Sequence, residues 1–313
     1  MTLQNRHITF GLFSVVLIAF AFQPIRELIA FALDLGNKHL SHIVLIPFIS
    51  ATLIFQSRKA IFAVVRTSVY PGVALMVIGA IFLVAGRAYA AQITKNDYLS
   101  LMTTGVLAIW LGGFLVIYGE PAFKAGLFPL LFLGFCIPMP TAFLDRVTWV
   151  LQTGSSDMLG ALLKLSGTPV FREGFFFSFP GLTIEVAKEC SSIRSTIAFF
   201  IAGILAAHLF LRTGWKRIVL LIALIPISVL KNALRIASLS LLAVHIDKRI
   251  LTSKLHEEGG IPFLIIGFIM LYPILALLVR SERQKIQPVP QLSIPNSHAT
   301  TGTGTAFLPT DEN

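Results

Sequence analysis

The sequence predicts an all-α membrane protein of about eight transmembrane helices, with a short β-hairpin in an extracytoplasmic loop region. Hydrophobic residues make up 55% of the 313 residues and charged residues only 13%, whereas soluble domains carry about 25% charged residues. The mean hydropathy is +0.81, and several apolar runs approach the roughly 20 residues that cross a bilayer core. Since no long polar linker divides residues 1–285, we expect a single polytopic domain there.

Eight apolar runs are the predicted spans. They cover about residues 8–28, 40–56, 69–91, 98–118, 123–140, 189–211, 218–243 and 260–279. The first is interrupted near its outer end by Gln23-Pro24, where it could continue as an interfacial helix. The fifth ends at Pro138-Met139-Pro140, because two prolines so close together stop a helix.

The longest polar region lies between the fifth and sixth spans. Its first half, Phe143–Leu165, mixes apolar and polar positions at helical spacing, which is typical of an interfacial helix. The second half changes period: Phe175–Phe179 and Leu182–Val186 predict two short strands around the Pro180-Gly181 turn. This hairpin leads the chain to Cys190.

The formal net charge of +10 does not predict nucleic-acid binding, because the cations punctuate the apolar runs, as a topology signal does. Clusters such as Arg58-Lys59 and Lys216-Arg217 directly flank spans on one side. We therefore expect both termini in the cytoplasm and Cys190 on the periplasmic face of the cell inner membrane. The last segment, 286–313, is rich in Pro, Ser, Thr and Gly and predicts a disordered cytoplasmic tail.

Three reactive side chains on separate segments are predicted at one depth. At 1.5 Å per helical residue, Cys190 lies about 31 Å from Leu211, and Arg235 lies about 26 Å from Ile218. His256 precedes the eighth span by four residues. A hydrocarbon core is about 30 Å thick, so all three belong at the outer membrane surface.

The chemistry of this group is consistent with nucleophilic catalysis. A thiolate forms more readily at a helix N-terminus or beside a cation, and Cys190 has both, the cation being Arg194 one turn deeper. Arg235 could stabilise an oxyanion on an attacked carbonyl, and the backbone amides of Ser191 and Ser192 could share that task.

The histidines complete the candidate site. His256 could take the thiol proton and return it to a leaving amine. His42, expected at the outer end of the second span, is a supporting candidate. No second histidine follows His256 at the spacing of a zinc-binding His-Glu-x-x-His helix, so we expect neither a metal nor another cofactor.

Each residue also has a structural interpretation when taken alone. The two cysteines, Cys136 and Cys190, leave a single disulfide open, although Cys136 fits core packing best. Arg235 with Asn232 could form an internal polar clamp, and His256 could be an ordinary loop residue. Only their joint occurrence at one depth favours a catalytic site.

The order of these motifs resembles the exosortase and archaeosortase transpeptidases, and His256 resembles the bacterial exosortase branch. The resemblance covers roughly Ser41 to Leu278 and departs at Ser192, where glycine is usual. Its motifs are Glu189-Cys190-Ser191-Ser192-Ile193-Arg194-Ser195, Pro226 with Asn232-x-x-Arg235-Ile236, His256 with Gly259-Gly260, Ser41-His42 with Ile46-Pro47, Pro138-Met139-Pro140, and Gly167-Thr168-Pro169-Val170 with Arg172-x-Gly174.

The resemblance implies an enzyme with Cys190 as nucleophile and Arg235 and His256 as its partners. Such enzymes recognise a C-terminal sorting signal on secreted proteins, made of a short motif such as Pro-Glu-Pro, a transmembrane helix and a basic cluster. They transfer the new carboxyl end to an acceptor, here of unknown identity and lipid- or polysaccharide-linked, and bacterial members often accompany exopolysaccharide production. Two alternatives stay open: a membrane cysteine protease that uses water, and a transporter or polysaccharide-assembly subunit that uses Lys231, Asn232 and Arg235.

Overall fold

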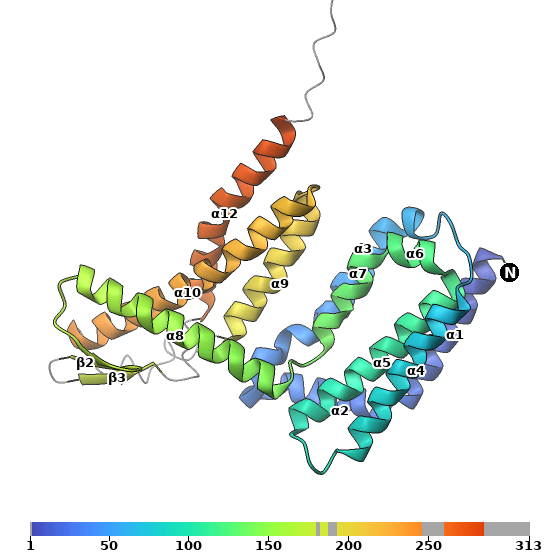
Figure 1. Cartoon of the computed structure of the whole chain (residues 1–313), viewed down its shortest axis with the longest axis horizontal. Coiled ribbons are helices and arrows are strands. Elements are labelled where there is room, and N and C mark those ends of the chain that lie inside the picture. The colour runs from blue at the N-terminus through green and yellow to red at the C-terminus, as the bar shows by residue number, and fades with distance from the viewer. Residues whose placement is uncertain (1, 180–181, 187–192, 246–259, 285–313) are drawn as a thin grey trace, which may run out of the picture.

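The computed structural model describes residues 2–179, 182–186, 193–245 and 260–284. Those residues form helices and one small sheet, arranged as two groups of helices with α3 and α7 between them (Figure 1). Among the predicted site residues, Cys190, Ser191, Ser192 and His256 lie outside the described residues, as does the tail 286–313.

The first half of the chain forms most of one group of helices. Its elements are α1 (Leu3–Phe20), α2 (Phe22–Leu33), the 3-10 helix η1 (Leu35–Val44), α3 (Ile46–Ile61), α4 (Val69–Ala88), α5 (Lys95–Tyr118), α6 (Glu120–Ala125), α7 (Leu127–Phe132) and the 3-10 helix η2 (Leu133–Cys136).

The second half forms the other group and carries the sheet. Its elements are α8 (Thr141–Leu165), β1 (Phe171–Glu173), β2 (Phe176–Phe179), β3 (Leu182–Glu185), α9 (Ile193–Phe210), α10 (Gly214–His245) and α12 (Gly260–Gln284).

The all-α membrane class is confirmed. In the described part of the chain, seven helices are long and apolar enough to cross a membrane, or eight if one bent helix pair forms a span. That pair corrects the prediction of one straight fifth span over 123–140: α6, α7 and η2 are separate pieces, and Leu127–Cys136 meets α8 at 91°. The bend follows from the prolines of Pro138-Met139-Pro140, which end the helix before α8 begins.

The first span also differs from its prediction. Helix α1 ends at Phe20, whereas the predicted span continued to residue 28. A second helix, α2, begins at Phe22, and its third residue is Pro24, a place near a helix start where the missing proline N–H costs little. The Gln23-Pro24 interruption therefore marks a change of helix.

Helices α4 and α5 pack backbone to backbone. Glycines recur every seventh residue at Gly72, Gly79 and Gly86 on α4 and at Gly105 and Gly112 on α5. A Cβ at Gly79 would lie 2.6 Å from the Gly105 carbonyl oxygen. Close approach through small residues is a common way for helices to associate in a membrane.

The sheet confirms the predicted hairpin and adds one strand to it. β2 and β3 pair antiparallel, with Phe177 opposite Ile184, and β1 pairs with the other edge of β2. Phe177 and Val186 are fully buried, in one cluster with Leu159 of α8 and Ile236 of α10. The sheet therefore packs over α8 and the far half of α10.

The beginning of α8 is joined to the beginning of α5. The Asp97 carboxylate accepts a hydrogen bond from the Thr141 backbone N–H at 2.6 Å. The Asn96 amide donates to the Met139 carbonyl oxygen at 2.7 Å. These bonds connect the two groups of helices at the end where the predicted site lies.

A buried polar cluster as the candidate functional site

Four polar side chains of α10 lie on one face of the helix and are buried. Ser228, Lys231, Asn232 and Arg235 recur at helical spacing. Their exposed fractions are 0%, 0%, 1% and 8%. Polar and ionisable groups inside a transmembrane helix are costly and usually functional, so this face is the strongest candidate site in the described part of the chain.

Lys231 connects α10 to the start of α9. Its ammonium nitrogen donates a hydrogen bond to the Ser195 hydroxyl at 2.7 Å. Its alkyl stem lies beside Gly267 of α12, where a Cβ would come within 3.2 Å of the Lys231 Cδ. Because Ser195 is only the third residue of α9, this bond sets the first turn of α9 level with Lys231.

Helix α8 supplies the opposite wall of the cluster. The Asn232 amide donates to the Ser155 hydroxyl at 3.0 Å. One turn earlier on α8, the Gln152 amide donates to the Val186 carbonyl oxygen at 2.5 Å. All four residues are buried, so α8 holds both α10 and the end of the sheet.

These bonds hold described residues on either side of the short segment that contains Cys190. Val186 is the last described residue before that segment, and α9 begins just after it. Gln152 holds Val186, and Lys231 holds Ser195. The described residues on the two sides of the cysteine segment, Val186 and Ser195, are therefore both held at the buried cluster.

Arg235 lies one turn beyond Lys231 on α10, toward the level at which α9 begins. Helices α9 and α10 follow each other through a short turn and run antiparallel (Figure 1). The direction from Ser195 back to the first residue of α9 is therefore the same as the direction from Lys231 on to Arg235. One helical turn, about 5.4 Å, separates Arg235 from Lys231, so Arg235 lies near the level at which α9 begins.

Two supporting candidates lie outside the buried cluster. Arg194, the second residue of α9, is exposed. His42 is half-buried on η1 and lines a cavity of about 300 Å³ together with Ile197 of α9 and Pro138. That cavity brings His42 close to the first turns of α9, although on a different side from Lys231.

The disulfide left open by the sequence is not formed. Cys136 is a free thiol, and its sulfur lies 3.8 Å from the Ile43 carbonyl oxygen, among side chains of the apolar core. This agrees with its interpretation as a packing residue.

Several members of the cluster did not appear among the predicted site residues. Gln152, Ser155 and Ser156 follow each other on α8 at helical spacing and are buried. The prediction treated this helix as interfacial, and an interfacial helix turns its polar side toward water. The serine pair was the available signal, because small polar residues are common where helices of a membrane protein contact each other.

The fold and the buried cluster define a class: a polytopic membrane protein with a cluster of buried polar side chains inside one group of its helices. A family model described as transmembrane exosortase matches residues 34–273, so the chain belongs to the transmembrane exosortase family. The match confirms the resemblance found in the sequence motifs. Comparisons with curated proteins and with solved structures found no match.

Proposed function

We propose that this chain is a membrane cysteine transpeptidase. It cleaves the C-terminal sorting signal of secreted proteins, of the Pro-Glu-Pro type, and transfers the new carboxyl end to an acceptor. Membership of the transmembrane exosortase family supports this class of function. In the proposal Cys190 is the nucleophile, Arg235 and His256 are its catalytic partners, and Asn232 and Lys231 position them.

One observation carries the proposal: the described residues on both sides of the segment with Cys190, Val186 and Ser195, are held at the buried polar cluster. The anchors are the 2.5 Å bond from Gln152 to the Val186 carbonyl and the 2.7 Å bond from Lys231 to the Ser195 hydroxyl. A nucleophile must be held close to its partners to benefit from proximity. Two anchors on one cluster are consistent with such an arrangement, and a freely hanging loop would have neither.

The proposed reaction has two steps. In the first, the Cys190 sulfur attacks the scissile carbonyl, its proton passes to His256, and the C–N bond breaks as His256 protonates the leaving amine. In the second, a nucleophilic acceptor loses its proton to His256 and displaces the sulfur from the thioester, and His256 returns that proton to the departing Cys190 sulfur. Arg235 donates to the oxyanion in both steps, and its burial keeps water from weakening that interaction.

The sheet is the proposed docking element for the substrate. In the order β1-β2-β3, one edge of β3 faces no other described strand. Thr183 and Glu185 are exposed on β3. An extended sorting motif can add to such an edge through main-chain hydrogen bonds that tolerate varied side chains.

The proposal places Cys190 on the periplasmic side of the cell inner membrane. The cationic clusters at the end of α3 and the start of α10 lie toward the same end of the helices, the upper end in Figure 1. Cations favour the cytoplasmic side of a membrane. A reporter fused at Asn313 should be active in the cytoplasm, and activity only in the periplasm would reverse the assignment.

The function is tested by co-expressing a tagged substrate with the wild type and with Cys190→Ala. Processing should stop in the variant while its abundance in the membrane stays normal. Continued processing would end the assignment of the nucleophile.

Mass spectrometry of the product's C-terminus separates transfer from hydrolysis. An added mass on the new carboxyl end supports transfer. A free carboxylate as the sole product, in cells that make exopolysaccharide and its lipid-linked precursors, would identify a protease.

A further inference from the structure

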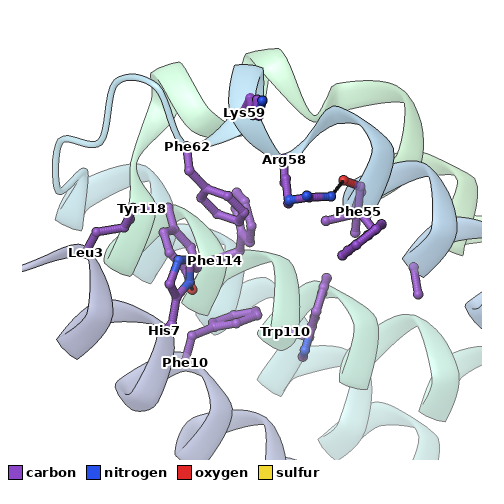
Figure 2. Close-up of a pocket in the computed structure, with 12 residues that line it drawn as sticks. Leu3, His7, Phe10, Phe55, Arg58, Lys59, Phe62, Trp110, Phe114 and Tyr118 are labelled. Atoms are coloured by element: carbon purple, nitrogen blue, oxygen red, sulfur yellow. Dashed lines mark hydrogen bonds between the residues drawn. The ribbon is translucent and has the colours of Figure 1, made fainter.

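A second cavity lies between α1, α3 and α5, in the other group of helices from the buried cluster of α8 and α10 (Figure 1 and Figure 2). Its volume is about 710 Å³, within the range of roughly 300–1,000 Å³ that small-molecule sites occupy. Of the described residues in the proposed site, neither Arg235, Asn232 nor Lys231 lines it. The proposed reaction therefore leaves this cavity without a role.

The cavity is polar at one end and apolar at the other. His7, Arg58, Lys59 and Tyr118 line it where α1 begins and where α3 and α5 end. The walls further along the helices are apolar and aromatic, and they reach Trp110, which precedes Tyr118 by eight residues or about 12 Å. This polarity matches an amphiphile with its head at a membrane surface and its chain in the hydrocarbon.

The polar end carries positive charge. Arg58 and Lys59 are exposed at the end of α3, and none of the described residues that line the cavity is a carboxylate. Arg58 lies with its guanidinium 3.9 Å from the centre of the Phe55 ring and donates one hydrogen bond, at 2.9 Å, to the Phe55 carbonyl (Figure 2). A guanidinium has five N–H donors, so this arrangement holds the group in place and leaves it suited to bind a phosphate.

The apolar end is a rigid aromatic wall. Trp110 and Phe114 of α5 pack against Phe10 of α1, with ring centres 5.1 and 5.6 Å from the Phe10 ring. The Trp110 indole N–H is already bound to the Ser14 hydroxyl at 3.0 Å. The face of this wall therefore offers carbon surface to a ligand and no free indole donor.

We propose that this cavity binds one anionic phospholipid, with its phosphate at Arg58 and Lys59 and an acyl chain along Phe10 and Trp110. The charge of the rim selects an anionic head over a zwitterionic one. The depth of about 12 Å fits the upper part of a chain, whereas a partner's transmembrane helix would need a groove along the full core of about 30 Å. The cavity has the same lining whichever way the chain is oriented across the membrane. Only the leaflet that supplies the lipid would change.

The test uses the intrinsic fluorescence of Trp110. The chain has three tryptophans, and the double replacement Trp149→Phe/Trp215→Phe leaves Trp110 as the single fluorophore. Both replaced side chains are exposed and lie outside this cavity, so their loss should not disturb it. The protein is placed in phosphatidylcholine nanodiscs and titrated with phosphatidylglycerol whose acyl chains carry bromine, which quenches tryptophan. Native mass spectrometry of the wild-type chain counts the lipids retained.

We expect saturable quenching by brominated phosphatidylglycerol and retention of one such lipid. Arg58→Gln/Lys59→Gln should weaken the apparent affinity about 30-fold, the effect of losing two cations beside an anionic lipid. The control Arg66→Gln/Arg212→Gln removes the same charge at exposed positions outside the cavity and should change little. Size-exclusion profiles verify that each variant is folded.

Three results would overturn the proposal. Equal quenching by brominated phosphatidylcholine in phosphatidylglycerol discs would show no selection for an anionic head. Full protection of Trp110 by glycerol phosphate, which has no acyl chain, would show that a free phosphate is the ligand. A co-purifying protein that crosslinks to the Trp110 wall and excludes the lipid would show that a helix is the occupant.

Discussion

The two groups of helices contain two different kinds of helix–helix contact. Helices α4 and α5 associate through glycine contacts, as at Gly79 and Gly105, without polar side chains. Helices α8, α9 and α10 associate around hydrogen bonds such as Lys231 to Ser195. Lipid gives helices no hydrophobic reason to associate, so either method serves for assembly alone. Burying the charged Lys231 is the costlier of the two, and ionisable groups inside a membrane are usually retained for function.

The sharpest way to test this difference is to change one arginine in each group. Arg235→Lys should lower substrate processing by roughly 100-fold or more, because lysine does not reproduce the planar, two-donor contact to an oxyanion. The matched control is Arg87→Lys on α4, whose guanidinium lies 5.4 Å from the Phe20 ring. Processing rates normalised to membrane abundance measure both, and equal loss in the two variants would refute a special role of Arg235.

A second comparison concerns two lysines. Lys231→Met keeps the length of a buried side chain but removes its bond to Ser195, so the cysteine segment loses one anchor. A displacement of about 1 Å can cost as much as 100-fold in rate, and we expect a loss between tenfold and that value. Lys124→Met, which breaks the exposed pair with Glu120, should have no effect.

The same Lys231 variant should change the rate at which Cys190 reacts with a maleimide, while Lys124→Met should not. The only other thiol, Cys136, is removed beforehand by Cys136→Ala so that the labelling reports one site. If Lys231→Met loses processing but labels at the wild-type rate, Lys231 does not position the cysteine segment.

A change in the glycine-packed group should affect stability without affecting chemistry. Gly79→Leu places a side chain against the α5 backbone, where even a Cβ would lie 2.6 Å from the Gly105 oxygen. Overpacking of this kind costs about 1–3 kcal/mol, and thermal unfolding in detergent measures it. Gly11→Ala, at a site with nothing within 4 Å, is the control. Lower activity per folded molecule in Gly79→Leu would mean that α4 and α5 also shape the catalytic site.

The smallest effect is expected from one hydroxyl. Ser155→Ala removes the acceptor of the Asn232 amide, and hydrogen bonds between membrane helices average about 0.6 kcal/mol. Ser238→Ala removes an exposed hydroxyl whose bond within the described part of the chain goes to the Leu234 carbonyl of its own helix, at 2.7 Å, so the unfolding temperature of that variant should not change. If Ser155→Ala is as neutral as that control, Asn232 does not depend on α8.

The spans could be predicted because their lengths and compositions obey a single rule, the thickness of the hydrocarbon core. The break near Pro138 was visible, but the 91° turn after it was not, since prolines end a helix without fixing the direction of the next one. The same limit applies to the site. The motif identified Arg235 and Asn232, whereas Ser155 and Gln152 became meaningful only once α8 was known to lie against α10.

In mechanical terms, α8 is a rigid connection between the sheet and helix α5. Its 25 residues span about 37 Å. Its first residue, Thr141, is hydrogen-bonded to Asp97 at the beginning of α5. Further along, the Asp157 carboxylate accepts a hydrogen bond from Arg172 of β1 at 2.7 Å, so the sheet is attached to the same helix. Ser155 lies two residues before that attachment. A force that a bound peptide exerts on the sheet is therefore transmitted along α8. It passes the contact between Ser155 and Asn232 before it reaches the bond to α5.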